Sequence, residues 1–480
     1  MQLHFIKIIA RQEWNTVFRS RTTRLLYFSL LAVSLLATIT GWQYVSKFNR
    51  QQAVAHQQVH DHWMSQPDRH PHRVAHYGYL VFREKSPLSF FDFGLDSYVG
   101  NAVFLEAHRQ NTINLSEASF SNGMLRFGEL SLALVIQLLV PLLIVFIGFS
   151  TIAGLKQNGV LKILLCQRAS FFDLLVGKTA GLTAAVWALF LPLILISLVA
   201  GSFFLSDDGL GIDSLLRIAI IVSLYAIYFL IVGVLVVGVS AVSTSAKNAL
   251  MVLVSGWILS VVVIPKSAQT LGSKLHEAPN KIAFEQAIEA ELSQQGDSHD
   301  PNDPHFAQLK ASLLQKYGVD SVQALPLNYG ALVMQESETI SSALFSKHFD
   351  RLIGIYQSQN AVSSALAFVD PFLAIRNLSM NLCGTDFNSF TAFQQQTEHY
   401  RYQKSQRLNQ IHLTQIRYKN DGQQKVSAKN WQQMPDFTFQ PITITESLST
   451  AGVSLAALTC WVLAGFGALY YISSKRNYLL

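Results

Sequence analysis

The sequence predicts a mainly helical membrane protein with six transmembrane helices and a large, mostly helical domain on one side of the membrane. Half of the 480 residues are apolar and only 14% are charged, against roughly a quarter in soluble domains. The apolar residues also gather in six runs that contain no Asp, Glu, Lys or Arg. A run of about 20 such residues is long enough to cross the hydrocarbon core as a helix.

The six runs define the predicted spans, and the fifth is short because it ends at Pro265. Residues 1–24 differ from these runs, because their apolar residues are interleaved with Lys and Arg. This pattern predicts an amphipathic helix in the membrane interface. The spans, in chain order, are Leu25–Val45, Leu130–Ile152, Thr179–Gly201, Ile218–Ser240, Ala249–Ile264 and Ser449–Ser473.

The distribution of charge predicts the orientation of these spans, because Lys and Arg collect in cytoplasmic loops. Residues 1–24 and 153–178, Lys247 and the tail after the last span together hold twelve bases and two acids. Residues 202–213 hold three Asp and no base. With six spans both termini lie on the same side, and we expect that side to be the cytoplasm. The net charge of +6 therefore reports orientation and not binding to nucleic acid.

Two long polar segments, residues 46–129 and 265–448, then fall on the extracytoplasmic side, and we expect them to pack into one domain. The second segment is predicted to be mostly helical, because apolar residues recur at helical spacing in Ile282–Leu292 and Leu332–Gln357. Asp370 and Pro371 are expected to interrupt this region, since the residue before a proline avoids the helical conformation.

The sequence lacks the motifs of an enzyme. Gly177-Lys178-Thr179 ends like a phosphate-binding loop, but Phe172 stands where that motif requires its first glycine. No zinc-protease, serine-hydrolase or paired-cysteine motif occurs. We therefore expect no catalytic residue in this chain.

Histidines crowd the first polar segment and raise the question of a metal site. Neutral imidazole is a common ligand of zinc and copper, but the spacing of these histidines matches no compact site and no cysteine assists them. We therefore expect solvated or hydrogen-bonded side chains and no metal. The histidines concerned are His56, His60, His62, His70, His72 and His76.

The layout of the chain and several short stretches resemble those of a known family. The stretch from His70 to Gly78 reads HPHRVAHYG, and the second polar segment contains Asp370-Pro371 and Gly384-Thr385-Asp386. With this order of spans and insertions, the chain resembles ABC-transporter permeases of the type-2 exporter class. It is closest in pattern to a bacterial subfamily with large extracytoplasmic insertions. The residues of the extracytoplasmic motif are His70, Pro71, Arg73, His76, Tyr77, Gly78, Asp370, Pro371, Gly384, Thr385 and Asp386.

The resemblance extends to the loop after the second span, where this class contacts its ATPase. Gly159, the leucine pair and Gly177-Lys178 match the class, whereas Val160 replaces the usual threonine. The resemblance implies a short coupling helix there. An ordinary amphipathic linker is the alternative. The residues expected to couple to the ATPase are Gly159, Lys162, Leu164, Leu165, Arg168, Phe171 and Phe172.

The resemblance also implies partners and a location. A separate ATP-binding cassette subunit would bind ATP and Mg²⁺, and a second permease chain, identical or related, would complete the translocation path. The chain would lie in the bacterial inner membrane and export or extract an amphipathic substrate. Its extracytoplasmic domain could shape an exit path or dock a periplasmic protein. The alternative is a mechanotransmission subunit, which drives an outer partner while no substrate passes through the spans.

Overall fold

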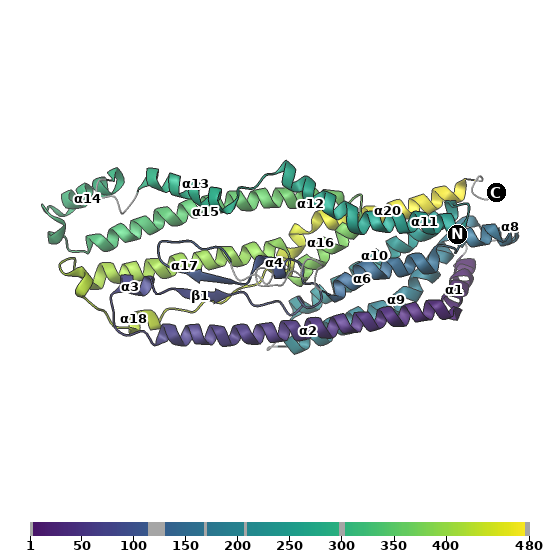
Figure 1. Ribbon diagram of the computed structural model, residues 1–480, viewed down its shortest axis with the longest axis horizontal. Coiled ribbons are helices and arrows are strands. Elements are labelled where there is room, and N and C mark those ends of the chain that lie inside the picture. The colour runs from purple at the N-terminus through teal and green to yellow at the C-terminus, as the bar shows by residue number, and fades with distance from the viewer. Residues whose placement is uncertain (1–2, 114–129, 168–169, 206–208, 297–302, 476–480) are drawn as a thin grey trace.

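The computed structural model of this protein is elongated and mostly helical (Figure 1). It describes residues 3–113, 130–167, 170–205, 209–296 and 303–475. Both termini lie at one end, together with the most apolar helices (Figure 1). We call the described residues of 46–113, 276–296 and 303–443 the polar half, and the remaining described residues the apolar half.

The apolar half contains six helices that are long and apolar enough to cross a membrane, which confirms the predicted number. Several of them are longer than the hydropathy indicated; the largest extensions include that of α2, which continues to Met64, and that of α9, which already begins at Phe171. These helices are α2 (Arg21–Met64), α6 (Leu132–Gly148), α9 (Phe171–Leu205), α10 (Ile212–Val242), α11 (Ala246–Ile258) with its continuation, and α20 (Gly452–Ser474).

The helix that contains the fifth predicted span does not end at Pro265 but continues to Leu275. A π-helical turn, Leu259–Val263, follows α11, and the chain continues as α12 (Ile264–Leu275). Proline lacks an N–H group, and its ring clashes with the carbonyl four residues earlier in an α-helix. A π turn widens the backbone just before the proline, and such turns occur inside otherwise regular helices. The helix therefore passes the proline without breaking.

Helix α1 (Leu3–Arg19) packs lengthwise on α9 instead of lying free. Gly177 and Gly181 of α9 allow the two backbones to approach, because a Cβ at Gly181 would lie 2.5 Å from the carbonyl oxygen of Ala10. Pairs of small residues four apart commonly permit such contacts between membrane helices. The contact also buries Glu13, whose carboxylate lies 2.6 Å from the ammonium of Lys178.

A buried chain of hydrogen bonds joins the two halves. The hydroxyl of Ser379 donates to Asp92 over 2.5 Å, so α16 (Pro371–Cys383) contacts the first polar segment. The hydroxyl of Tyr225 in α10 donates to Ser379 over 3.1 Å and accepts from the amide of Gln137 in α6 over 2.8 Å. Four segments that are distant in the sequence therefore share one polar network, which we call the joint.

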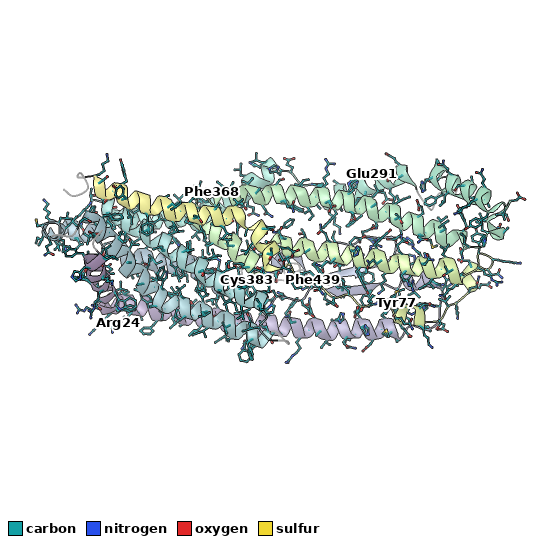
Figure 2. The ribbon with its side chains drawn as sticks, turned by 180° about the vertical axis from the view of Figure 1, so that it is seen from behind. Arg24, Tyr77, Glu291, Phe368, Cys383 and Phe439 are labelled. Carbon is teal, nitrogen blue, oxygen red and sulfur yellow. The ribbon has the colours of Figure 1, made fainter. Side chains whose placement is uncertain are left out.

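Arg217 at the start of α10 strengthens the joint. Its guanidinium donates to the carbonyl oxygens of Leu382 over 3.1 Å and of Ile442 over 2.7 Å. It also pairs with Asp213 one helical turn earlier, at 2.6 Å. Cys383, next to Leu382, marks this region near the middle of the molecule, whereas Tyr77 lies toward the far end of the polar half (Figure 2).

The polar half is built from long helices beside a small hairpin. Helices α15 and α17 pack against each other, and the extension of α2 runs along the same half (Figure 1). Strands β1 (Tyr79–Phe82) and β2 (Ala102–Leu105) pair antiparallel, with Tyr79 opposite Leu105. The other helices of this half are α3 (Pro71–Ala75), α4 (Asp96–Val99), α13 (Lys281–Gln295), α14 (Pro304–Tyr317), α15 (Tyr329–Leu366), α17 (Phe387–Gln415) and α18 (Lys429–Gln432), and α19 (Ile444–Thr450) leads back to the last span.

The polar half has its own hydrophobic core. Trp63 at the end of α2, Val81 of β1, Phe393 of α17 and Trp431 of α18 are buried in it. The indole N–H of Trp63 donates to the carbonyl oxygen of Trp431 over 3.2 Å. Residues of both polar segments therefore pack into one hydrophobic core.

We predict that Gly181→Val separates α1 from α9. The new side chain would overlap backbone atoms of Ala10, and overpacking of this kind typically costs about 1–3 kcal/mol. In detergent the variant should melt at a lower temperature than the wild type, and protease should cut α1 faster. Gly467→Val in α20 is the matched control, because no atom lies within 4 Å of a Cβ at Gly467. Equal behaviour of the two variants would contradict the prediction.

Candidate functional site

The residues that the sequence singled out lie in three regions: the connection after α6, the helix ends near the joint, and the surroundings of α3. The first is the connection between α6 and α9, which forms two short helices, α7 (Ala153–Gln157) and α8 (Val160–Leu165). This α7–α8 segment lies at the end that holds both termini (Figure 1). Gly159 separates the helices with a φ of +70°, a left-handed conformation that glycine adopts without strain.

The base of the α7–α8 segment is attached to the end of α10. The hydroxyl of Ser240 accepts from the backbone N–H groups of Ile152 and Ala153, over 3.1 and 3.0 Å. The ammonium of Lys156 donates to the carbonyl oxygen of Ala241. These bonds hold α7 against a span, so a force on the segment would reach α10 directly.

The far side of α8 is exposed. The side chain of Ile163 is 64% exposed and that of Val160 is 37% exposed, although both are apolar. Lys162 is exposed beside them, and Leu161 is buried on the opposite face. Neither Val160 nor Ile163 was among the residues predicted from the sequence. The helical register could have indicated them, because Leu161 and Leu165 lie on one face of α8 and Ile163 on the other.

The other predicted coupling residues are buried to different degrees. Leu164 and Leu165 are half-buried. Phe171 is buried in the apolar half, and Phe172 packs edge-on against Tyr470 of α20, with 5.9 Å between ring centres. Arg168 lies outside the described residues.

The extracytoplasmic motif falls into two separate places. One part forms helix caps near the joint. Asp370, which directly precedes Pro371, caps the start of α16. Its side chain accepts a hydrogen bond from the backbone N–H of Phe372. Gly384 ends α16 with a φ of +70°, and Asp386 caps the start of α17. The backbone carbonyl of Thr385, between them, accepts from Leu95 of the first polar segment.

The other part of the motif surrounds α3 in the polar half. His70 caps this helix by accepting from the backbone N–H of His72 over 3.2 Å, and Pro71 occupies its first turn. Tyr77 stacks on His62, and Arg73 is exposed. Any other residue at Gly78 would force its neighbours to move. The φ of Gly78 is +78°, and a Cβ there would overlap the ring of Phe104.

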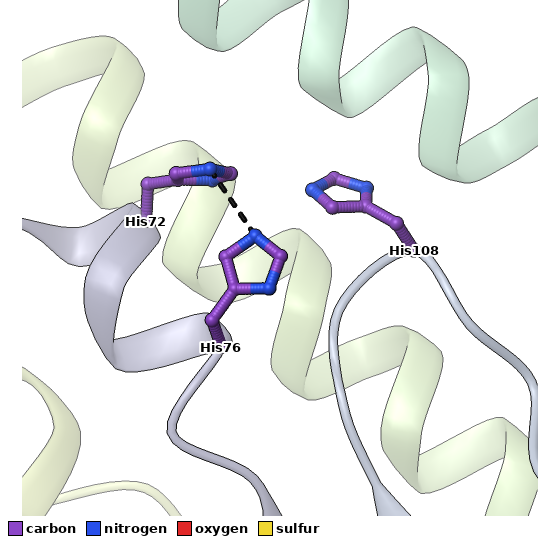
Figure 3. A group of neighbouring side chains, drawn as sticks. All are labelled: His72, His76 and His108. Atoms are coloured by element: carbon purple, nitrogen blue, oxygen red, sulfur yellow. Dashed lines mark hydrogen bonds between the residues drawn. The ribbon is translucent and has the colours of Figure 1, made fainter.

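Three histidines from two segments converge beside α3 (Figure 3). We call His72, His76 and His108 the histidine cluster. The Nε2 atoms of His72 and His76 are 3.2 Å apart, and the ring of His108 is centred 5.6 Å from that of His72. Burial lowers the pKa of His72 to about 4, with a further contribution from the two neighbouring rings. His72 is therefore neutral near pH 7, the form in which imidazole binds metals.

A buried carboxylate lies behind the histidine cluster. Glu338 of α15 is fully buried and accepts from the backbone N–H of His108 over 3.2 Å. Its Oε2 atom also lies 3.6 Å from Nδ1 of His108. The guanidinium of Arg401 in α17 pairs with Glu338 at 2.6 Å and with Glu398 at 2.8 Å. The carboxylate is thus held in place from the opposite side.

A second group of metal-ligating side chains lies next to the first. His70, His412 and Asp421 are close enough to share an ion. His412 and Asp421 already share a hydrogen bond of 2.7 Å, and the side chain of Asn328 also donates to this carboxylate. Burial and the adjacent His412 lower the pKa of His70. Because His412 and Asn328 already donate to Asp421, we interpret this group as a structural hydrogen-bond network.

Comparison with known proteins gives one finding about the second polar segment. A family described as a domain of unknown function (DUF3526) matches residues 281–440, one third of the chain. The match includes Glu338, Arg401 and His412, but none of the three cluster histidines. No curated protein matches this sequence. The match names no activity, so function must be argued from the geometry.

The sequence did not indicate that His108 joins the histidine cluster, or that Glu338 and Arg401 lie behind it. His108 stands alone in the sequence, 32 residues after His76, and Glu338 and Arg401 belong to the other polar segment. Only the β1–β2 hairpin and the packing of α15 on α17 bring them together. A local pattern could have shown His72 and His76 four residues apart, but it could not have shown the third ring.

A lysine in the core of the polar half gives this region a pH-dependent stability. The ammonium of Lys404 lies 3.5 Å from the ring centre of Trp63 and 3.7 Å from that of Tyr79. Burial lowers its pKa to about 7, although the nearby Asp436 favours the charged form. An unfolded lysine titrates near pH 10.4, so the unfolded chain binds more protons than the folded chain between about pH 7 and 10.

We predict that the wild type becomes more stable relative to Lys404→Met as the pH rises from 7 to 9. For one proton, the free energy of unfolding should change by up to about 1.4 kcal/mol per pH unit. Denaturant titration in detergent at each pH measures this difference. Lys419→Met, at an exposed position of the same half, should keep the pH dependence of the wild type. A pH-independent difference between wild type and Lys404→Met would contradict the assignment.

Proposed function

We propose that this chain is the membrane-spanning permease subunit of an ATP-binding cassette transporter in a bacterial inner membrane. It would export or extract an amphipathic substrate, and a separate cassette subunit would bind ATP and Mg²⁺. The six apolar helices and the shared end of both termini support this proposal. The basic residues of α1 and of the α7–α8 segment favour a cytoplasmic location for that end.

The observation that carries the proposal is the exposed apolar face of α8. Val160 and Ile163 are exposed beside the charged Lys162, while the other side of the segment is bonded to α10 through Ser240. An apolar side chain with a basic rim is typical of the centre of a protein interface. A contact made there by an ATPase would move the end of α10, which extends to the joint through Tyr225 and Arg217.

Two further features suit an amphipathic substrate and a second permease chain. A cavity of about 530 Å³ lies at the junction of the two halves, beside α2 and the start of α10. Both signs of charge line it, from Glu84, Lys85, Asp213 and Arg217, together with apolar residues such as Leu88, a mixture that would accept an amphipathic molecule. On α9, Phe203 and Phe204 are exposed and would face lipid or a second chain.

We predict that Ile163→Glu releases the ATPase. Loss of a central anchor typically costs at least about 2 kcal/mol, or roughly a thirtyfold loss of affinity. The protein is purified gently from native membranes, and the co-purifying cassette ATPase is quantified by mass spectrometry and ATP hydrolysis. Asn15→Glu, an exposed position of α1 at the same end, is the control and should retain the ATPase. Retention of the ATPase by Ile163→Glu, or its absence from the wild type, would contradict the proposal.

The length of α2 favours mechanotransmission as a second candidate function. This helix runs for 44 residues without interruption, or about 66 Å at 1.5 Å per residue. It connects the apolar half to the core around Trp63, so a tilt of its span would displace the far end of the polar half. In that case ATP binding would drive a partner outside the membrane, and no substrate would cross the spans.

The two functions differ in where ATP produces movement. Spin labels at the exposed positions Arg50 of α2 and Lys310 of α14 report movement within the polar half. For mechanotransmission we predict a shift of their distance distribution when ATP binds the purified complex with its ATPase. Labels at Lys47 and Asp61, both on α2, are the control and should not shift. An unchanged Arg50–Lys310 distance would favour the permease that conducts its substrate.

A further inference from the structure

The histidine cluster has the geometry of a metal site. One ring nitrogen from each of His72, His76 and His108 lies within 4.8 Å of the others. Figure 3 shows the rings arranged around a common space, with His72 on α3, His76 directly after this helix and His108 on the facing loop. The three side chains therefore approach one point from two separate segments.

The spacing of the nitrogens fits a tetrahedral ion. Zn–N bonds are about 2.0–2.1 Å long, so two nitrogens bound to one tetrahedral zinc lie about 3.3 Å apart. The Nε2 atoms of His72 and His76 are 3.2 Å apart. His108 is farther away, but its ring is centred 5.4 Å from that of His76, and a small rotation of the side chain would bring its nitrogen into reach.

The backbone holds the two histidine segments together. His72 and His76 are four residues apart and share one face of the helical turn, whose end is closed by a hydrogen bond from the backbone N–H of His76 to the carbonyl oxygen of His72. The backbone N–H of Ala107 donates to Ala75 over 3.3 Å, which joins the residues next to His108 and His76. His108 itself adopts a φ of +60°, an uncommon conformation for a residue with a side chain.

Glu338 supplies the supporting interaction expected around a metal-binding histidine. Such histidines usually direct their second nitrogen toward a carboxylate, which orients the ring and makes the ligand more basic. Here the Nδ1 atom of His108 lies 3.6 Å from Glu338. Glu338 is fully buried and is fixed in turn by Arg401. Because the Nδ1 atom of His108 is directed toward Glu338, its Nε2 atom faces the cluster.

We propose that His72, His76 and His108 bind one divalent transition-metal ion, with Zn²⁺ as the ion used to test the site. Three imidazole ligands suit zinc, copper or nickel and disfavour calcium and magnesium, which prefer oxygen ligands. His76 is exposed, so the fourth position is open to water or to a ligand from outside. The site depends on no contact of the proposed ATPase, and either proposal can fail without the other.

The consequence of binding is a cross-link within the first polar segment. The ion would tie α3 to the loop after β2, and through Glu338 and Arg401 to α15 and α17. Metal ions stabilise the folded chain when they bind it in preference to the unfolded chain. The melting temperature of the purified protein should therefore rise with the concentration of Zn²⁺.

The test is a zinc titration of the full-length protein without an affinity tag, in detergent and after treatment with a chelator. Competition with a chromophoric chelator should show one Zn²⁺ per chain. His72→Gln/His76→Gln and His108→Gln should each lower the affinity at least about tenfold, and Glu338→Gln should lower it by roughly 10- to 100-fold. With Co²⁺ in place of Zn²⁺, the wild type should show the visible absorption of a four-coordinate ion, and the double variant should not.

The matched control is His56→Gln/His60→Gln. These two histidines are also four residues apart, on α2, and each lies 3.2 Å from Asp436. The control should bind Zn²⁺ like the wild type. The metal-free melting temperature of each variant shows whether it is folded, and His76→Gln alone, at an exposed position, provides a variant with little risk to the fold. The proposal is overturned if the wild type shows no saturable binding, if the cluster variants bind with unchanged affinity, or if the control loses the site equally.

Discussion

The joint between Asp92, Ser379, Tyr225 and Gln137 is the interaction on which the arrangement of the molecule depends. All four side chains are buried, and buried polar groups are costly unless each finds a partner. At the edge of an apolar bundle neither lipid nor bulk water can replace those partners. The network therefore requires α6, α10, α16 and the first polar segment to meet in one arrangement. Arg217 adds a second requirement, because its guanidinium bonds to the ends of α16 and of the segment before α19.

The spans could be predicted from the sequence because hydropathy and length alone determine whether a helix can cross a membrane. The interruption at Asp370-Pro371, between α15 and α16, was also visible locally. The extension of α2 to Met64 was not visible, since its residues beyond Val45 are polar and have no clear apolar stripe. The passage of the fifth span through Pro265 was missed for another reason. It requires a π turn, and no residue type marks a π turn in the sequence as proline marks a break.

The candidate sites also contain some features that the local sequence indicates and others that depend on tertiary contacts. The resemblance implied a short helix around Gly159, and the structure has the short helices α7 and α8 on either side of this residue. Which side chains are exposed there depends on how the segment rests against the spans: Ile163 is exposed, whereas Phe171 is buried. Much of the extracytoplasmic motif consists of caps and turns: Asp370, Gly384 and Asp386 end or begin helices, and Gly78 makes room for Phe104. The histidine cluster joins α3 to the loop after β2, and its supporting residues Glu338 and Arg401 come from the other polar segment. No local pattern contains these contacts.

The uninterrupted course of α2 also limits how its sequence can change. Each residue added to an α-helix turns everything beyond it by about 100° and advances it by 1.5 Å. One extra residue after Val45 would carry Trp63 away from Trp431 and from the ammonium of Lys404, with which it now packs. Substitutions along this stretch do not change the direction in which Trp63 points from the helix. Insertions and deletions preserve this direction only in steps of about seven residues, or two turns. The length of this segment is therefore under stricter constraint than its composition, the opposite of what holds for an ordinary loop between a membrane span and an adjoining domain.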